Sequence, residues 1–239
     1  CLRMFVCICR ICRSGLLILC MVLTLINSVP VFAATPVQIV PMQLQQGTLI
    51  SVQIPQIDSG LPPELMSHYN EVFRQVVLQP LKTFETSAYK TRLIDSMPEA
   101  VKAGLTLRAE YEVFRSDAKF ISLIQRFYQF TGGAHGMTLQ IGHTIDRTSG
   151  RQLNLVDLFL NGANYAERMN RFVLEEGRAR KLPMWDFKGI GEKSAFYLSD
   201  TGIVLFFQQY EIAPYSAGII QMQIPYELML DILQPGLVR

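Results

Sequence analysis

Apolar and polar residues alternate with a period of two over residues 105–113. Leu105, Leu107 and Ala109 share one parity, and charged or polar side chains occupy most of the other. This period is typical of a strand in a sheet that exposes one face to water. Apolar runs at 119–130 and 137–146, joined to it by short loops, predict two further strands. Short loops favour an antiparallel meander over parallel crossovers.

A period close to four predicts a helix that begins at the pair Pro62-Pro63 and ends near Pro80. A second helix is predicted over residues 164–180. Strands are further predicted at 48–54, 195–198, 203–210 and 217–224, and a short helix is predicted from Pro225. The predicted fold class is α+β, an antiparallel β-sheet with helices packed on one face.

The N-terminal 33 residues have the pattern of a secretory signal peptide. Arg10 and Arg13 precede an uncharged apolar run at 15–26, and Val31 and Ala33 supply small residues for cleavage after Ala33. The run is short of the roughly 20 apolar residues that span a bilayer; an uncleaved anchor over 15–33 is the alternative. The predicted organisation is therefore a signal peptide at 1–33, an extended lead-in at 34–47 and a domain at 48–239. Within the domain, 48–103 form a small N-terminal region and 104–239 the main sheet region.

Cleavage would change the chemistry available to the domain. All five cysteines lie in the first 20 residues, so a cleaved chain has no disulfide, cysteine nucleophile or thiolate metal site. Only three of the 22 basic residues and none of the 20 acidic ones lie in 1–33, which leaves a nearly neutral domain. We therefore expect no nucleic-acid partner. No later apolar run approaches spanning length, so no membrane span is expected after cleavage. The expected location is exported: periplasmic, secreted or associated with the cell surface.

A glycine-rich stretch, Thr131 to Gly136, separates two predicted strands. Its backbone could cradle an anion, or its glycines could serve only a tight connection. His135 is its most interesting polar side chain, and Glu211 or Asp146 could join it as a carboxylate for acid–base work. Strand-end carboxylates are more often turn formers, so no catalytic residue is assigned. No paired-histidine spacing is present, and neither a metal site nor a cofactor is expected.

Aromatic side chains are the other candidates for binding. Tyr210, Tyr215 and the lone Trp185 could stack on a sugar. Alternatively, Trp185 and Phe187 plug the edge of the sheet after the second helix. The candidate ligand-binding residues are Gly132, Gly133, His135, Tyr210, Tyr215 and Trp185.

Four ordered motifs resemble a family of extracytoplasmic domains of unknown function. They are residues 131–136, 146–159, 207–218 and 224–228. The family includes the sensor portion of the anti-sigma factor RsiV and the N-terminal region of the deacetylase PdaC. The resemblance covers roughly residues 48–235 and implies an α+β fold in a cell-envelope setting. In RsiV such a domain binds lysozyme, and in PdaC the chemistry belongs to a separate domain.

Two functions follow as hypotheses. The first is an exported, non-catalytic binding or sensing module for a cell-envelope ligand, either a protein such as lysozyme or a peptidoglycan fragment. Its contact region is expected at 132–136 together with 210–218. The alternative is an envelope glycan or amide hydrolase that uses His135 with Glu211 or Asp146. That alternative predicts that these side chains converge in one pocket.

Overall fold

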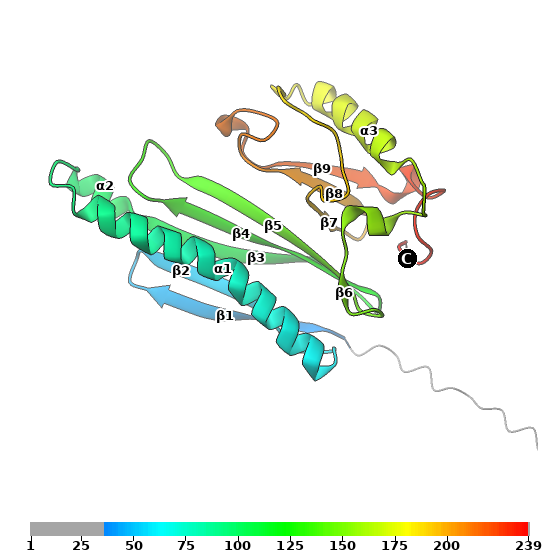
Figure 1. The fold of residues 1–239 in the computed structure, drawn as a ribbon, viewed down its shortest axis with the longest axis horizontal. Helices are drawn as coiled ribbons and strands as arrows, with labels where there is room; N and C mark the ends of the chain where they lie inside the picture. The colour runs from blue at the N-terminus through cyan, green and yellow to red at the C-terminus, as the bar shows by residue number, and fades with distance from the viewer. Residues whose placement is uncertain (1–35, 239) are drawn as a thin grey trace, which may run out of the picture. The chain divides into compact units, whose positions relative to one another are not determined.

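The computed structural model describes residues 36–238, which form two β-sheets with helices packed on them (Figure 1). The predicted α+β fold class is confirmed. The predicted signal peptide lies outside the described residues. No helix among residues 36–238 is long and apolar enough to cross a membrane.

The larger sheet has six strands in chain order, and all neighbours are antiparallel except β2 and β3, which pair in parallel. Its strands are β1 (Gln38–Gln46), β2 (Ile50–Ser59), β3 (Thr106–Ser116), β4 (Phe120–Phe130), β5 (Met137–Asp146) and β6 (Arg151–Gln152). The predicted meander of three strands is present as β3, β4 and β5. Because β2 and β3 pair with each other, the sheet crosses the predicted division at 103/104.

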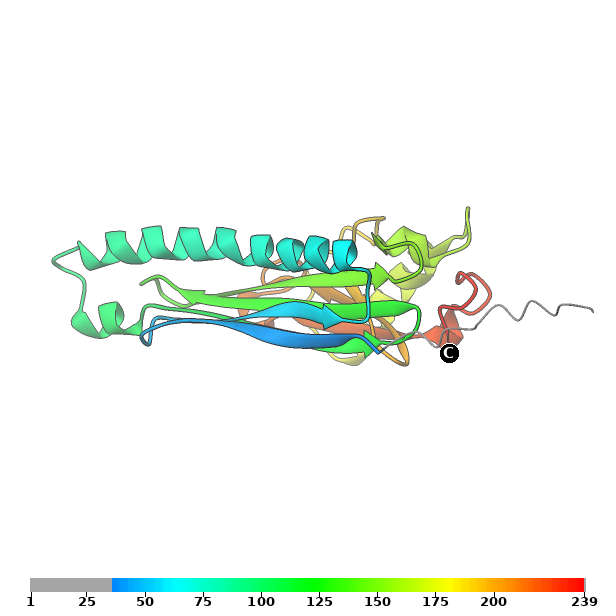
Figure 2. The same ribbon diagram turned by 90° about the horizontal axis from the view of Figure 1, so that it is seen from below.

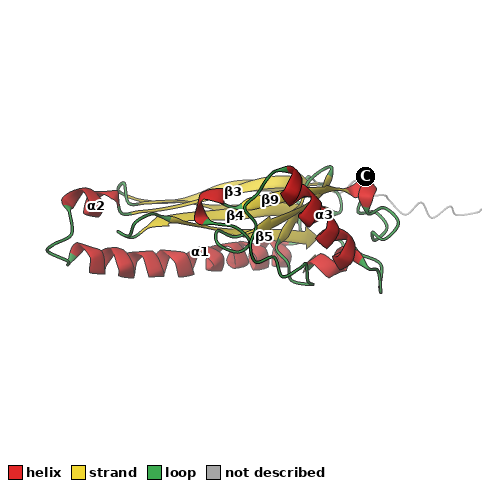
Figure 3. Ribbon diagram, turned by 90° about the horizontal axis from the view of Figure 1, so that it is seen from above, coloured by secondary structure: helices red, strands yellow, loops and turns green. Residues whose placement is uncertain are grey.

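One helix, α1 (Pro63–Arg92), runs along one face of this sheet (Figures 2 and 3). The predicted end near Pro80 is wrong, because the helix continues for three more turns. Proline lacks the N–H that would bond to the preceding turn, at a cost of about 3 kcal/mol. Phe84 and Ala88 continue the buried face beyond it, and burial of a phenylalanine contributes roughly 2–3 kcal/mol. A short helix, α2 (Glu99–Gly104), then leads into β3.

The strand β1 lies within the segment predicted to be an extended lead-in. It pairs with β2 along its whole length, so residues 38–46 are extended, as predicted, and form a regular strand of the larger sheet. The alternation of Val40, Met42 and Leu44 with proline and glutamine is the signal that identifies it as a strand.

The second sheet contains β7 (Phe196–Leu198), β8 (Gly202–Phe207) and β9 (Ile220–Pro225). The predicted single sheet is therefore wrong for these strands, which pack face to face on β4 and β5. Tyr197 and Phe206 meet Ile124 of β4 in one buried cluster. The predicted second helix is confirmed as α3 (Tyr165–Ala179), whose Met169 and Val173 pack against the second sheet. Three 3₁₀ turns complete the fold, at Leu155–Leu158, Tyr215–Ala217 and Tyr226–Leu228.

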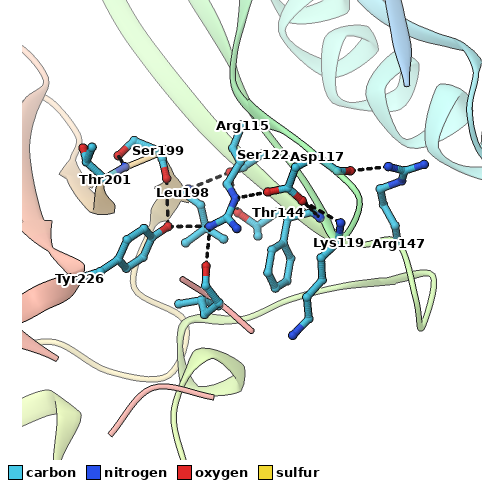
Figure 4. A network of polar contacts seen from close by, with 12 residues as sticks. Arg115, Asp117, Lys119, Ser122, Thr144, Arg147, Leu198, Ser199, Thr201 and Tyr226 are labelled. Carbon is cyan, nitrogen blue, oxygen red and sulfur yellow. Dashed lines mark hydrogen bonds and ion pairs between the residues drawn. The ribbon is translucent and has the colours of Figure 1, made fainter. Parts of the chain in front are cut away.

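Polar contacts join the two sheets (Figure 4). Ser122 of β4 accepts a hydrogen bond at Oγ from the backbone N–H of Leu198, at 2.8 Å. The same hydroxyl lies 2.9 Å from that of Thr144 in β5. At the end of β3, the buried Arg115 donates to the hydroxyl of Tyr226 at 3.0 Å and to the carbonyl of Leu237 at 2.8 Å. These bonds fix the second sheet and the C-terminal segment on the larger sheet.

Candidate functional site

The glycine-rich loop between β4 and β5 is shaped by close packing. Gly132 has a φ of 100°, and a Cβ added there would lie 2.7 Å from the Thr91 methyl carbon at the end of α1. The hydroxyl of Thr91 also donates to the carbonyl of Thr131 at 2.7 Å. A Cβ at Gly136 would collide with the ring of Tyr128, whereas Gly133 is uncrowded. The observed geometry therefore fits a tight strand connection, which was the alternative to an anion cradle.

The segment 208–218 is clamped on the free edge of β5 by two glutamines. The Oε1 of Gln208 accepts from the N–H of Gln140 at 3.0 Å, and its Nε2 donates to the carbonyl of the same residue at 2.7 Å. The Oε1 of Gln209 accepts from the N–H of Thr138 at 2.6 Å. These amides bond to β5 where a neighbouring strand otherwise would. Their role was missed from the sequence, which placed both in the predicted strand 203–210. That prediction is wrong for residues 208–210, because β8 ends at Phe207.

The clamp brings Tyr210 and Tyr215 to His135. The imidazole of His135 stacks on the ring of Tyr215, with centroids 3.9 Å apart and an interplanar angle of 24°. Its Nδ1 lies 3.0 Å from the carbonyl of Gly136, and its Nε2 lies 3.3 Å from the hydroxyl of Tyr210. These contacts fit the tautomer that donates from Nδ1 and accepts at Nε2. We refer to His135, Tyr210 and Tyr215 as the aromatic cluster.

Tyr210 has an unusual backbone conformation. Its φ of 68° lies in the left-handed region, which a residue with a bulky side chain rarely adopts. The turn that holds it is closed by Glu211, whose N–H donates to the carbonyl of Gln208 at 3.1 Å and whose carboxylate accepts from the Gln208 N–H at 2.7 Å. The carboxylate of Glu211 is thus engaged in its own turn.

The predicted convergence of Asp146 with His135 is wrong. Asp146 ends β5, whereas the loop that carries His135 precedes Met137 at the strand's beginning. A strand of ten residues separates its ends by roughly 30 Å. The carboxylate of Asp146 instead accepts from the N–H of Thr148 at 2.8 Å, as a turn former does.

Trp185 and Phe187 behave differently from each other. Phe187 packs edge-on against Phe207, with centroids 5.9 Å apart, and so fills the sheet edge as the alternative predicted. Trp185 is 55% exposed. Its backbone N–H donates to the carbonyl of Ile212 at 2.9 Å, which places Trp185 beside the clamped segment.

Several cavities lie along β5. A groove of about 410 Å³ adjoins the clamp and is lined by apolar side chains of Phe127, Met137 and Leu139 and by Pro80 of α1. A wider cavity of about 730 Å³ lies at the opposite end, beside Asp146 and Arg151. In that cavity Arg151 pairs with Asp157 at 3.3 Å. The groove, not the wider cavity, is continuous with the segment that carries the aromatic cluster.

The remaining candidate chemistry is structural. Burial lowers the pKa of His143 to about 4, and its Nε2 lies 3.0 Å from the amide oxygen of Gln125. This histidine belongs to the core. Within residues 36–238, no three His, Cys, Asp or Glu side chains are grouped so that they could hold a metal ion.

Two family models match successive parts of the chain. The model described as deacetylase PdaC matches residues 44–138, which include β2, α1, β3 and β4. The model described as a protein of unknown function (DUF3298) matches residues 156–227, which include α3 and the second sheet. Among curated proteins, the chain is 24% identical over 136 residues to the peptidoglycan-N-acetylmuramic acid deacetylase PdaC of Bacillus subtilis strain 168. The match covers 54% of this chain but only 29% of that relative's length.

Solved structures agree on the fold. A DUF3298 family member from Bacteroides fragilis NCTC 9343 has a TM-score of 0.62 at 18% identity, covering 83% of this chain and 94% of its own. A DUF3298 family protein from Pseudomonas aeruginosa PAO1 has a TM-score of 0.56 at 21% identity, covering 85% and 96%. The resemblance to RsiV stays a prediction. The predicted resemblance to the PdaC type of domain is confirmed, and this chain is similar to PdaC-like domains of unknown function that carry a DUF3298 part.

Proposed function

We propose that this chain is an exported, non-catalytic binding module that recognises a cell-envelope ligand at the aromatic cluster. The first ligand class to test is a peptidoglycan fragment, and the second is an envelope protein such as lysozyme. The relation to PdaC, a peptidoglycan-N-acetylmuramic acid deacetylase by name, supports the envelope setting. The single observation that carries the proposal is the stack of His135 on Tyr215, with the hydroxyl of Tyr210 at the Nε2 of the same imidazole.

The strain at Tyr210 supports a role in binding. A left-handed backbone at a residue other than glycine costs on the order of 1 kcal/mol and persists where the surrounding structure enforces it. Tyr210 is nevertheless 47% exposed, so burial of its ring contributes only part of the stabilisation that a core aromatic side chain gives. An exposed aromatic side chain held in a strained turn offers a rigid apolar face with a polar tip, which suits a sugar or a peptide.

The carboxylates support binding rather than acid–base chemistry. A general base must lie within hydrogen-bond reach of its proton, directly or through one water. Asp146 ends the strand that His135 precedes, and Glu211 closes the turn at Gln208. The pair that a hydrolase would need is therefore engaged elsewhere.

Binding is tested by calorimetric titration of the purified full chain with soluble peptidoglycan fragments and, separately, with lysozyme. Tyr215→Ala removes the ring that stacks on His135, and we expect at least a roughly tenfold loss of affinity, as for a central aromatic contact. Tyr89→Ala is the matched control, because Tyr89 is 66% exposed on α1 and the truncation is the same. The proposal fails if neither ligand binds, or if both variants weaken binding equally.

Catalysis and export are tested separately. Mass spectrometry of peptidoglycan incubated with the protein is expected to show no released or modified fragment. Turnover that disappears in His135→Ala would contradict the non-catalytic assignment. N-terminal sequencing of the protein recovered from the envelope or medium is expected to give a chain that begins at Ala34, and a chain that keeps residues 1–33 would contradict cleavage.

A further inference from the structure

The outer edge of the larger sheet is formed by β1. In the part of the chain that the structure describes, no strand lies beyond it. An edge strand of nine residues presents backbone N–H and C=O groups that can pair with another strand. Natural proteins usually protect such edges with charges, prolines or a covering element.

Two prolines show which residues of β1 direct their backbone N–H and C=O groups toward the open edge. Pro41 lies opposite Pro55 of β2, and neither residue has an N–H to exchange. This pair therefore occupies a non-hydrogen-bonded position of the ladder. Residues of the same parity, Gln43 and Gln45, accordingly direct their N–H and C=O groups away from β2 and toward the open edge.

The side chains of this edge are apolar on one face and amides on the other. Val40, Met42 and Leu44 are 43%, 38% and 42% exposed. The β2 partners of Met42 and Leu44 are buried beneath α1, so these three side chains continue the apolar face of the sheet past the helix. No charged residue occurs from 36 to 57. The edge thus lacks the charge that would repel an identical edge.

We infer that a second copy of this chain pairs with β1 in antiparallel fashion, about a two-fold axis at Leu44. In this register Gln43 of each copy faces Gln45 of the other, and each such pair can exchange two backbone hydrogen bonds. Pro41, which has no N–H to offer, falls outside these pairs. Leu44 meets its counterpart on the axis, and the two apolar stripes merge into one.

A second copy suits this edge because the edge is self-complementary. Its amides pair with amides and its apolar stripe pairs with itself, whereas a charged partner would find no opposite charge. One strand from each copy buries less than the roughly 800 Å² per partner of a typical stable interface. The expected dimer is therefore weak and depends on concentration.

The test is sedimentation velocity of the purified full chain over a concentration series. The dimer fraction is expected to rise with concentration. Leu44→Lys places two like charges together on the axis and is expected to lower the association constant by at least about tenfold. Gln53→Lys is the matched control, since Gln53 lies opposite Gln43 on β2, one strand inside the edge, and adds the same charge.

A covalent test fixes the register. Oxidised Leu44→Cys is expected to form a disulfide between position 44 of the two copies, located by peptide mass spectrometry, because facing residues at a non-hydrogen-bonded position have Cα atoms about 4.5 Å apart. Gln53→Cys is expected to give no such link. A protein that stays monomeric throughout, lysine variants that associate alike, or a position 44 that does not link to itself would each overturn the proposal.

Discussion

Replacement of Arg115 by methionine removes the centre of the network that ties the C-terminal segment to the larger sheet. The guanidinium is buried and donates to Asp117 at 2.6 Å, to the Tyr226 hydroxyl at 3.0 Å and to the Leu237 carbonyl at 2.8 Å. Removal of one partner of a buried ion pair typically costs 3–5 kcal/mol. Asp117 keeps two backbone N–H donors, Lys119 and Phe120. We therefore expect the lower end, about 3 kcal/mol of unfolding free energy.

Urea denaturation followed by circular dichroism measures this loss. With a slope of about 2 kcal/mol per molar urea, the midpoint is expected to fall by about 1.5 M. Arg74→Met is the control, because the pair of Arg74 with Glu71 is exposed and is worth less than about 1 kcal/mol. A loss below about 1 kcal/mol in Arg115→Met, or equal losses in both variants, would refute the reasoning.

The pH dependence of the same variant gives a second measure. Burial raises the pKa of Asp117, but hydrogen bonds from the Phe120 N–H, the Arg115 guanidinium and the Lys119 N–H outweigh it and hold the pKa well below the usual range. Stability linked to this carboxylate is present above its ordinary pKa, near 4, and is lost as the pH falls below that value. Because Arg115→Met removes one of these causes, its midpoint is expected to fall less between pH 5 and pH 2.5 than that of the parent.

Three further predictions concern the core histidine, the clamp and the aromatic cluster. Because burial lowers the pKa of His143 to about 4, the unfolding free energy is expected to fall by up to about 3 kcal/mol as the pH drops from about 6.5 to 4. Urea midpoints of His143→Gln at both pH values are expected to show a smaller fall. Gln208→Ala leaves the N–H and C=O of Gln140 without their partner, which is expected to cost about 1–3 kcal/mol in the same assay; unchanged stability would contradict the clamp. Tyr210→Gly relieves the left-handed backbone, so stability is expected to stay within about 1 kcal/mol of the parent while calorimetric affinity for envelope fragments falls at least about tenfold. If the glycine variant binds with the same affinity as the parent, the assignment of Tyr210 to the binding site is contradicted.

Local sequence patterns predict much of the fold where tertiary contacts do not override them. The strand β5 has the predicted bounds, because its apolar parity and the turn after it are both local signals. The extension of α1 past Pro80, by contrast, could not be predicted from local patterns. The cost of a proline is local, whereas the gain from burying Phe84 depends on a sheet built largely from later residues. Local sequence likewise cannot assign β7, β8 and β9 to a separate sheet. A strand in a sheet that packs face to face on another has the same hydrophobic pattern as a strand that pairs edge to edge within one sheet.

The candidate site, too, could be predicted from the sequence only in part. The loop 132–136 and the segment 210–218 are predicted to act together, and their aromatic side chains do meet. What brings them together is a pair of glutamine amides that replace a strand, and nothing in the sequence distinguishes such amides from solvated ones. The separation of Asp146 from His135 follows, by contrast, from the predicted strand 137–146 alone, because its length places its two ends far apart. With Glu211 closing its own turn, the contacts of the His135 side chain across the site are an aromatic stack and one tyrosine hydroxyl, and the proposed binding role rests on these two contacts.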